Sequence, residues 1–139
     1  MYSRILIPVD LDEPSSWGKA VPVAQAMAAS FGASITLCTV VPDSVARMEA
    51  QWSSLSYKAL VDKAAARLLL LAGELGAEDA ATEVGMGSIP GGILDIADQI
   101  DADLIVLSSH RPEMKDWLLG ANAARVARHA KCSVLIVRD

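Results

Sequence analysis

The chain has 139 residues, a length that fits one domain with a full hydrophobic core and is too short to predict two. Hydrophobic residues make up 53% of it and charged residues 21%, which excludes a disordered chain. The formal net charge of −5 opposes long-range attraction to nucleic acid and to an anionic membrane, so we expect neither as a partner.

Five short apolar runs predict five β-strands. Four of the runs are nearly continuous rather than alternating, which is typical of strands covered on both faces in a parallel sheet. The third run alternates more, so we expect it at an edge of the sheet. In chain order the runs cover residues 5–9, 34–41, 81–86, 104–107 and 133–137.

The first segment between strands has an apolar stripe with helical spacing that ends before Gly32. Pro22 lies inside this pattern, where a proline removes a backbone donor and clashes with the previous turn. The helix is therefore expected either to kink or to begin near residue 20 or 21. The stripe consists of Trp17, Val21, Ala24, Ala28 and Phe31.

Three further stripes predict one helix in each remaining segment between strands. The second helix follows a long connection over residues 42–59, which has room for a short helix of its own, and Gly76 is its expected stop. The stripes are Leu60, Val61, Ala64, Leu68, Leu71 and Leu75, then Ile89, Ile93, Ile96, Ala97 and Ile100, then Leu119, Ala123, Val126, Ala127 and Ala130.

The regular alternation of strands and helices predicts a single doubly wound α/β sandwich, because parallel neighbours require right-handed crossovers. Ligands of such sheets collect beyond the carboxyl ends of the strands, where the strand order reverses. Four segments that follow strands are therefore candidates for a binding site. They read PVDLDEPSS, VVPDS, GMGSIPGG and SSHRPEMKDWLLGAN.

Two features suggest a reduced, soluble protein of the cytoplasm. Cys38 and Cys132 both sit in apolar runs without a CxxC or Cys/His pattern, so we interpret them as buried reduced thiols. The amino-terminal segment lacks the apolar h-region of a signal peptide, and no apolar run approaches the roughly 18 residues of a membrane span.

The segment GMGSIPGG, residues 85–92, partly matches a dinucleotide fingerprint. Pro90 occupies the third glycine position of GxGxxG, and the Walker sequence GxxxxGK[ST] is absent from the chain. We therefore interpret the segment as a turn that uses Gly85 and Gly87, with Gly91 and Gly92 at the start of a helix.

Polar residues after the first and fourth strands are the best candidates for binding. Asp10 ends the first strand, where a carboxylate either accepts hydrogen bonds from a ribose hydroxyl or belongs to a solvated loop or helix cap. His110 follows two serines, but no GxSxG turn accompanies them, which favours a polar loop over a catalytic triad.

The residues Gly120, Ala121 and Asn122 open the last helix, where backbone N–H groups lack intrahelical partners. These donors and the helix dipole favour an anion, and Arg111 and Arg125 could supplement them. The alternative is an ordinary helix cap formed by the Asn122 side chain.

The chain resembles the universal stress proteins over essentially its whole length. The residues that carry the resemblance are RILIPVD (4–10), ADLIVLSSHRP (102–112) and WLLGANAARVARHAKCSVLIVR (117–138). The last two stretches are similar to a bacterial subgroup with the segments SHRP, YLLGSNAA and VRHAxCSVLVVR. The resemblance implies a five-stranded parallel sheet of order 3-2-1-4-5 and a homodimer formed through the last strand, Ser133 to Val137.

Members of this family that bind ATP typically carry G-x2-G-x9-G-[S/T] after the fourth strand. In this chain the first two glycine positions fall on Ser108 and Arg111, the spacer has eight residues, and Ala121 follows Gly120. The subgroup binds adenine nucleotides with its own variant of the loop. The resemblance therefore implies ATP or another adenine nucleotide, with or without Mg²⁺, as the ligand.

Carried over position by position, the resemblance assigns parts of the pocket to parts of the nucleotide. Pro8, Val9 and Asp10 lie near the adenine and ribose, and the backbone of Val40 or Val41 lies against the adenine. Ser109, His110 and Arg111 surround the phosphates, and Gly120, Ala121 and Asn122 form the phosphate end.

Two hypotheses about function follow. The first is a nucleotide-responsive stress module rather than an efficient enzyme, because no general base or metal constellation stands out; slow ATP hydrolysis or autophosphorylation is the most we expect. The second is an interaction module of the same fold that recruits an unknown protein partner and binds no nucleotide. Two features favour the second hypothesis: Ala121 offers no hydroxyl, and Ser108 and Arg111 stand where the motif has glycines.

Overall fold

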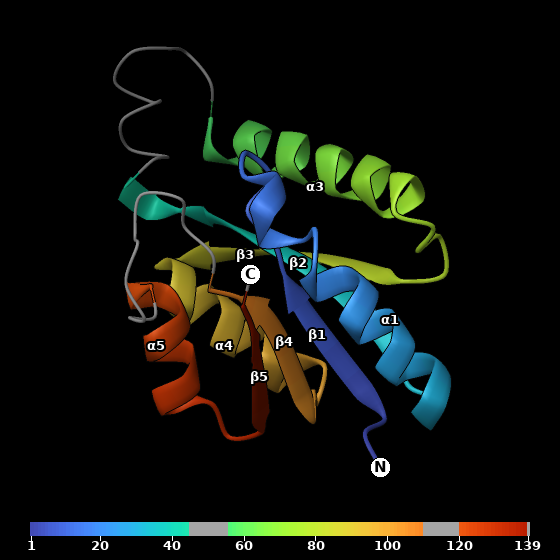
Figure 1. The fold of residues 1–139 in the computed structure, drawn as a ribbon. Helices are drawn as coiled ribbons and strands as arrows, with labels where there is room; N and C mark the ends of the chain where they lie inside the picture. Colours follow the sequence, from blue (N-terminus) through green and yellow to red (C-terminus); the bar gives the residue numbers. More distant parts are fainter. Residues whose placement is uncertain (45–55, 110–119, 139) are drawn as a thin grey trace.

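The computed structural model describes residues 1–44, 56–109 and 120–138 and shows one parallel five-stranded sheet with helices on both faces (Figure 1). The strand order is β3-β2-β1-β4-β5, so the predicted order and the predicted edge position of the third strand are confirmed. The strands are β1 (Arg4–Pro8), β2 (Ser34–Pro42), β3 (Ala81–Gly87), β4 (Leu104–Ser108) and β5 (Ser133–Val137).

The helices form two layers, with α1 and α3 on one face of the sheet and α4 and α5 on the other (Figure 1). A short 3-10 helix, η1 (Pro14–Ser16), follows β1. Part of the connection that we expected to hold an extra helix, residues 45–55, lies outside the described residues. The helices are α1 (Ala20–Phe31), α3 (Tyr57–Glu74), α4 (Ile89–Gln99) and α5 (Ala121–His129).

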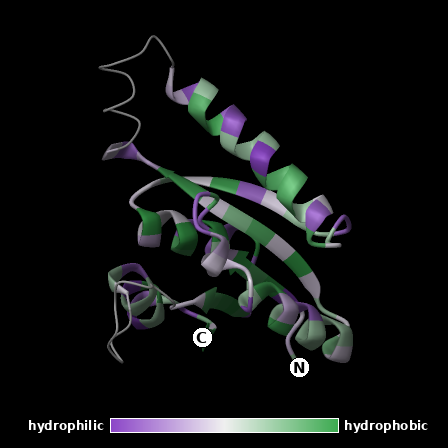
Figure 2. Ribbon diagram, turned by 45° about the horizontal axis from the view of Figure 1, so that its top comes forward, coloured by the Kyte–Doolittle hydropathy of each residue, from purple (hydrophilic) through white to green (hydrophobic). Residues whose placement is uncertain are grey.

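Alternating side chains of the central strands supply both halves of the core. Ile5 and Ile7 of β1 face α1 and α3, whereas Leu6 between them faces α4 and α5, and all three are fully buried. The continuous apolar runs of the central strands β1 and β4 therefore reflect cover on both faces. The hydropathy colouring marks much of the sheet as hydrophobic (green in Figure 2).

The first helix begins at Ala20, as the position of Pro22 predicts. Pro22 is the third helical residue and so lies in the first turn, where the missing N–H would have no intrahelical acceptor. Gly32 ends the helix with φ at +68°, a left-handed conformation that favours glycine. Gly76 has a similar φ of +67° just after α3, which confirms the predicted stop.

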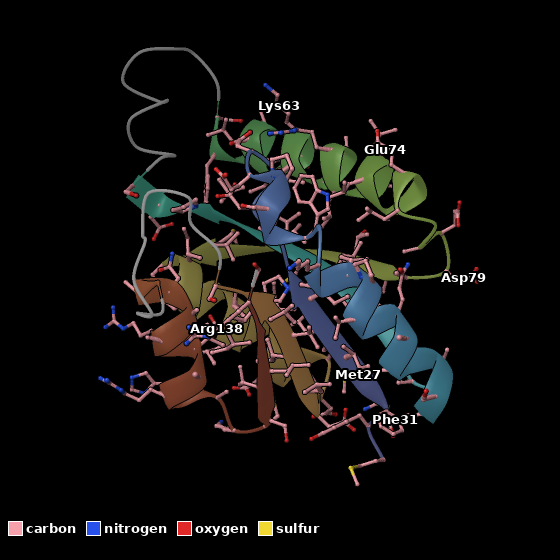
Figure 3. All side chains as sticks on the ribbon, in the orientation of Figure 1. Met27, Phe31, Lys63, Glu74, Asp79 and Arg138 are labelled. Carbon is pink, nitrogen blue, oxygen red and sulfur yellow. The ribbon has the colours of Figure 1, made fainter. Side chains whose placement is uncertain are left out.

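Four apolar residues are more exposed than predicted. Ile89, the first residue of α4, is 38% exposed. Phe31, at the end of α1, is 40% exposed and packs edge-to-face on Tyr2 (Figure 3). Ala127 points to solvent because α5 is short and buries only Ala123 and Val126. Cys132 is half-buried just before the edge strand β5, so only Cys38 is a fully buried thiol.

Within the described residues, none of the helices combines the length and the apolar character needed to cross a membrane.

We expect substitution by alanine to have opposite effects on the free energy of unfolding at two glycines that lie in helices. A Cβ on Gly92 of α4 would lie 2.8 Å and 2.9 Å from the γ carbons of Val40 and 3.0 Å from the carbonyl oxygen of Met86. A Cβ on Gly73 of α3 would meet nothing within 4 Å. We expect Gly92→Ala to lower the free energy of unfolding by about 1–3 kcal/mol through overpacking.

We expect Gly73→Ala, the matched control, to raise that free energy by about 0.5–1 kcal/mol, because alanine loses less backbone entropy in a helix. Urea unfolding monitored by circular dichroism measures both changes. A stabilised Gly92→Ala protein would show that α4 does not pack against β2 as closely as the distances indicate.

The carboxylate of Asp103 joins the start of β1 to the turn before β4. Its two oxygens accept hydrogen bonds from the backbone N–H of Ser3 at 2.8 Å and of Arg4 at 3.0 Å. Desolvation raises the pKa of this carboxyl. The hydrogen bonds from the backbone N–H groups of Arg4 and Ser3 lower the pKa by more than desolvation raises it, so the pKa lies below the ordinary 3.8.

A lowered pKa in the folded state means that Asp103 stabilises the fold above pH 3.8 and that this contribution is lost as pH falls through the folded-state pKa. We expect Asp103→Asn to destabilise the protein near neutral pH by less than about 1 kcal/mol, since solvent screens an exposed carboxylate. Urea unfolding of the unchanged protein and of Asp103→Asn at a series of pH values should show that their free energies of unfolding become more similar in acid. A difference that stays constant down to acid pH would contradict this role.

Candidate functional site

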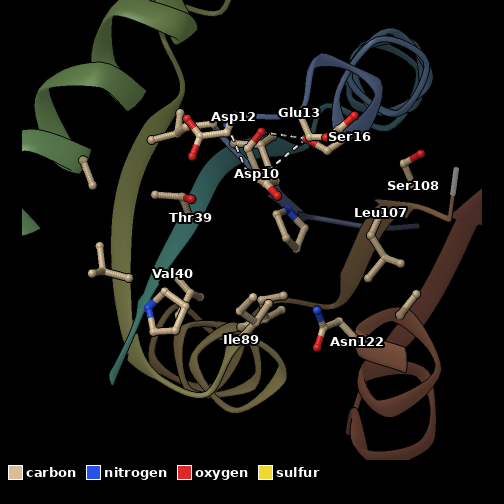
Figure 4. A pocket seen from close by; sticks show the side chains of 18 of the residues that line it. Asp10, Asp12, Glu13, Ser16, Thr39, Val40, Ile89, Leu107, Ser108 and Asn122 are labelled. Carbon is tan, nitrogen blue, oxygen red and sulfur yellow. Dashed lines mark hydrogen bonds between the residues drawn. The ribbon is translucent and has the colours of Figure 1, made fainter. Parts of the chain in front are cut away.

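A pocket of about 630 Å³ opens at the carboxyl ends of β1, β2 and β4. The order of the strands reverses between β1 and β4, so this is the place where a doubly wound sheet leaves a crevice. The amino-terminal ends of α4 and α5 and the first half of α3 complete its walls (Figure 4).

Most of the predicted site residues that the structure describes line this one pocket. Ala121 does not: it is exposed at the start of α5. His110 and Arg111 lie outside the described residues. The predicted residues that line the pocket are Pro8, Val9, Asp10, Val40, Val41, Ser109, Gly120 and Asn122.

Asp10 takes part in the hydrogen bonds of its own loop, which is one of the two roles that the sequence left open. Its Oδ1 accepts a hydrogen bond from the backbone N–H of Asp12 at 3.0 Å, so the carboxylate stabilises its own loop. Its backbone N–H donates to Ser16 Oγ at 2.8 Å, and that hydroxyl donates back to the Asp10 carbonyl at 3.1 Å. Within the described part of the chain, Oδ2 accepts no hydrogen bond, and Asp10 lines the pocket (Figure 4).

The pocket has apolar side chains from β2 and α4. Val40 and Ile89 lie on the same side of it, and the hydroxyl-bearing Thr39 is 6% exposed beside them (Figure 4). Gly85 and Gly92 leave room for Val40, since a Cβ on either glycine would come within 3.2 Å of its side chain. This end of the pocket can therefore hold a flat apolar group.

The carbonyl of Val41 already has a partner. Tyr57, the first residue of α3, donates its hydroxyl to this oxygen at 2.8 Å. Burial and the neighbouring Asp43 carboxylate raise the pKa of the Tyr57 phenol, so the donor stays protonated at neutral pH. Val41 thus lines the pocket, but its carbonyl oxygen already accepts the hydrogen bond from Tyr57.

The amino-terminal end of α5 forms the opposite wall. Gly120 is the N-cap and makes no side-chain capping bond, and Asn122 lies inside the helix with its side chain toward the pocket (Figure 4). The alternative prediction of an Asn122 cap is therefore wrong. The first backbone N–H groups of a helix lack intrahelical acceptors, and together with the dipole they favour an anion at this wall.

Two cationic residues of α3 also line the pocket, and the sequence analysis did not place them there. Lys63 and Arg67 are four residues apart and flank the buried Ala64, so they lie at the edge of the face that packs on the sheet. Their helical spacing beside an inward alanine was the available signal. Only the tertiary fold brings that edge next to the loop after β1.

The segment GMGSIPGG forms the end of β3 and the start of α4, as predicted, except that Gly85 lies inside the strand. Gly87 ends β3 with φ at +90°, and Ser88 caps α4 by accepting a hydrogen bond from the Gly91 N–H at 3.1 Å. No group of three or more His, Cys, Asp or Glu residues that could hold a metal ion occurs among residues 1–44, 56–109 and 120–138.

Comparison with known proteins gives consistent matches over the full chain. Residues 1–138 match the model of the universal stress protein family. The chain is 32% identical to universal stress protein G of Salmonella typhimurium over 143 residues, covering 99% of this chain and 100% of the relative.

Two solved structures share the fold along nearly their whole length. Universal stress protein UspA from Lactobacillus plantarum is 25% identical with a TM-score of 0.72, and the match covers 99% of this chain and 98% of that one. A universal stress protein solved in complex with cAMP is 26% identical with a TM-score of 0.64, covering 99% and 97%. The family match, the curated relative and the shared sheet order together show that the chain belongs to the universal stress protein family.

Proposed function

We propose that this protein binds an adenine nucleotide in the pocket at the carboxyl ends of β1, β2 and β4. The proposal rests on one observation: apolar side chains, a carboxylate and the amino terminus of a helix all line one pocket of about 630 Å³. Small-molecule and cofactor pockets typically measure about 300–1,000 Å³ and combine apolar walls with few polar groups. The cAMP complex of the 26% identical family member supports the same class of ligand.

Each part of the nucleotide has a matching part of the pocket. Val40 and Ile89 would hold the base, and Asp10 would accept hydrogen bonds from the ribose hydroxyls. Gly120 and Asn122 would hold the phosphates at the start of α5, where backbone N–H groups and the helix dipole favour anions. Ser109, His110, Arg111 and Ala121 remain predicted contacts of the phosphate end.

Isothermal titration with ATP and with AMP, each with and without Mg²⁺, tests this function. We expect saturable heat with at least one of the two nucleotides and a matching rise in melting temperature. No heat and no thermal shift at millimolar nucleotide would remove the proposal. That result would favour the interaction module, for which the missing hydroxyl at Ala121 is the supporting observation.

We further propose that the protein acts in the cytoplasm as a homodimer that pairs through β5. This strand is at an edge of the sheet, and Val134, Leu135, Ile136 and Val137 are only half-buried in the single chain. An edge strand with partly exposed apolar side chains is a template for pairing with a second copy. Sedimentation equilibrium should give twice the mass of the chain, and a monomer at micromolar concentration would contradict the dimer.

A further inference from the structure

One side chain of α3 holds the loop that follows β1. Arg67 Nη2 lies 3.0 Å from Asp12 Oδ1 and 3.1 Å from the carbonyl oxygen of Leu11. The Arg67 side chain is 44% exposed, and both it and the loop line the pocket. This contact therefore joins two walls of the pocket that are far apart in the sequence.

The contact continues through the loop to Asp10. The backbone N–H of Asp12 donates to Asp10 Oδ1 at 3.0 Å, and the N–H of Glu13 donates to the Asp10 carbonyl at 3.0 Å. On the other side, Ser16 Oγ accepts from the Asp10 N–H at 2.8 Å. The Asp10 carboxylate is thus oriented by the backbone of Asp12, and Arg67 holds the side chain of Asp12.

The charges of the loop explain why it needs such a contact. Asp10, Asp12 and Glu13 place three carboxylates within four residues, and they repel one another. The Arg67 guanidinium offsets the charge of Asp12 and fixes the backbone at Leu11 with a second hydrogen bond. A loop held in one conformation before binding loses less entropy when the ligand arrives.

We propose that Arg67 is a positioning residue that sets the Asp10 carboxylate for the ribose hydroxyls of a nucleotide. The inference rests on the proposed function, because it assigns Asp10 to the ribose. Arg67 acts through Asp12 and the Leu11 carbonyl, which both accept from the same nitrogen. By positioning Asp10, Arg67 favours ligands that carry both ribose hydroxyls, and this preference does not depend on how many phosphates the ligand has.

The test compares AMP with 2′,3′-dideoxy-AMP, which lacks the two ribose hydroxyls and keeps the base and phosphate. Isothermal titration gives the Kd of each ligand for the unchanged protein and for Arg67→Met. We expect Arg67→Met to weaken AMP binding about three- to fivefold, the upper part of the range for loss of a solvent-exposed ion pair. The Kd of the dideoxy ligand should stay the same, so the preference for AMP falls by that factor.

Lys63→Met is the matched control. Lys63 lies one turn before Arg67 on α3 and lines the same pocket, so this variant removes the same charge from the same wall. Any effect of that charge on a phosphate should change both Kd values equally. If Arg67→Met also weakens both ligands equally, Arg67 acts on the phosphate or on the whole fold and the positioning role is overturned.

Amide hydrogen exchange separates this inference from the nucleotide proposal. In the ligand-free protein, we expect Arg67→Met to speed exchange at the Asp12 and Glu13 amides about three- to fivefold relative to amides of β4, and Lys63→Met to leave them unchanged. Unchanged exchange in Arg67→Met would overturn the inference. Failure of the unchanged protein to bind either AMP or ATP would instead remove the nucleotide proposal, and exchange alone would then decide whether Arg67 holds the loop.

Discussion

Asp10→Asn is expected to weaken AMP binding by about ten- to a hundredfold, the equivalent of about 1.5–3 kcal/mol for a hydrogen bond to a charged group. Asparagine keeps Oδ1, which accepts the N–H of Asp12 at 3.0 Å, and replaces the remaining oxygen with an amino group that cannot accept from a ribose hydroxyl. The loop should therefore stay in place while the ribose contact is lost. Isothermal titration measures the change in Kd.

Glu13→Gln provides the control for this substitution. Glu13 belongs to the same loop and lines the same pocket, and the variant removes one negative charge in the same way. Removal of a negative charge near an anionic ligand should leave binding unchanged or strengthen it. If Asp10→Asn weakens AMP binding although it also removes a negative charge, the weakening must come from the lost hydrogen bond between the carboxylate and the ribose. Equal changes in the two variants would contradict the ribose contact.

Ile105→Ala is expected to lower the free energy of unfolding by about 2–5 kcal/mol, the range for large-to-small changes in a core. Ile105 is fully buried in β4, between β1 and β5, and pairs in register with Leu6. Its side chain packs in the cluster that joins the sheet to α4 and α5, so truncation leaves a cavity bounded by rigid strands. Urea unfolding at fixed protein concentration measures the loss.

Ile105→Val removes one methylene from the same position and should cost about 0.5–1.5 kcal/mol. The two values together distinguish a rigid cavity from a core that collapses around the gap. A loss below about 1 kcal/mol for Ile105→Ala would mean that α4 and α5 move inward to fill the space.

The strands could be predicted well because their signal is local. Buried parallel strands must be apolar on both faces, so the runs at 5–9 and 104–107 needed no knowledge of their neighbours. The equally apolar run at 133–137 forms an edge strand that is only half-buried, which its sequence did not show. Helix limits were also local where glycine or proline set them, as at Gly32 and Pro22. Exposure was less predictable: Ala127 has helical spacing, but the short α5 leaves it in solvent.

The candidate site was predicted only in part, for a reason of geometry. Residues that closely follow strands, such as Asp10 and Ser109, were identifiable because strand ends converge at a switch point, and Gly120 was identifiable as the start of the last helix. Thr39 and Arg67 were not predicted. The spacing of Arg67 from the buried Ala64 places it at the edge of the packed face of its helix, but that spacing does not show that this edge lies at the pocket. Their place depends on how closely α3 and α4 pack on the sheet.

By itself the sequence determined the five strands, the four helices between them and the family resemblance, and it predicted the carboxyl ends of the strands as the place of the pocket. These follow from periodicity, turn residues and motifs, which act over a few residues. Only the tertiary structure decided that Arg67 reaches Asp12, that Tyr57 takes the Val41 carbonyl and that Asn122 lines the pocket instead of capping a helix. Such contacts join distant segments, and their distances are set by the packing of whole helices on the sheet.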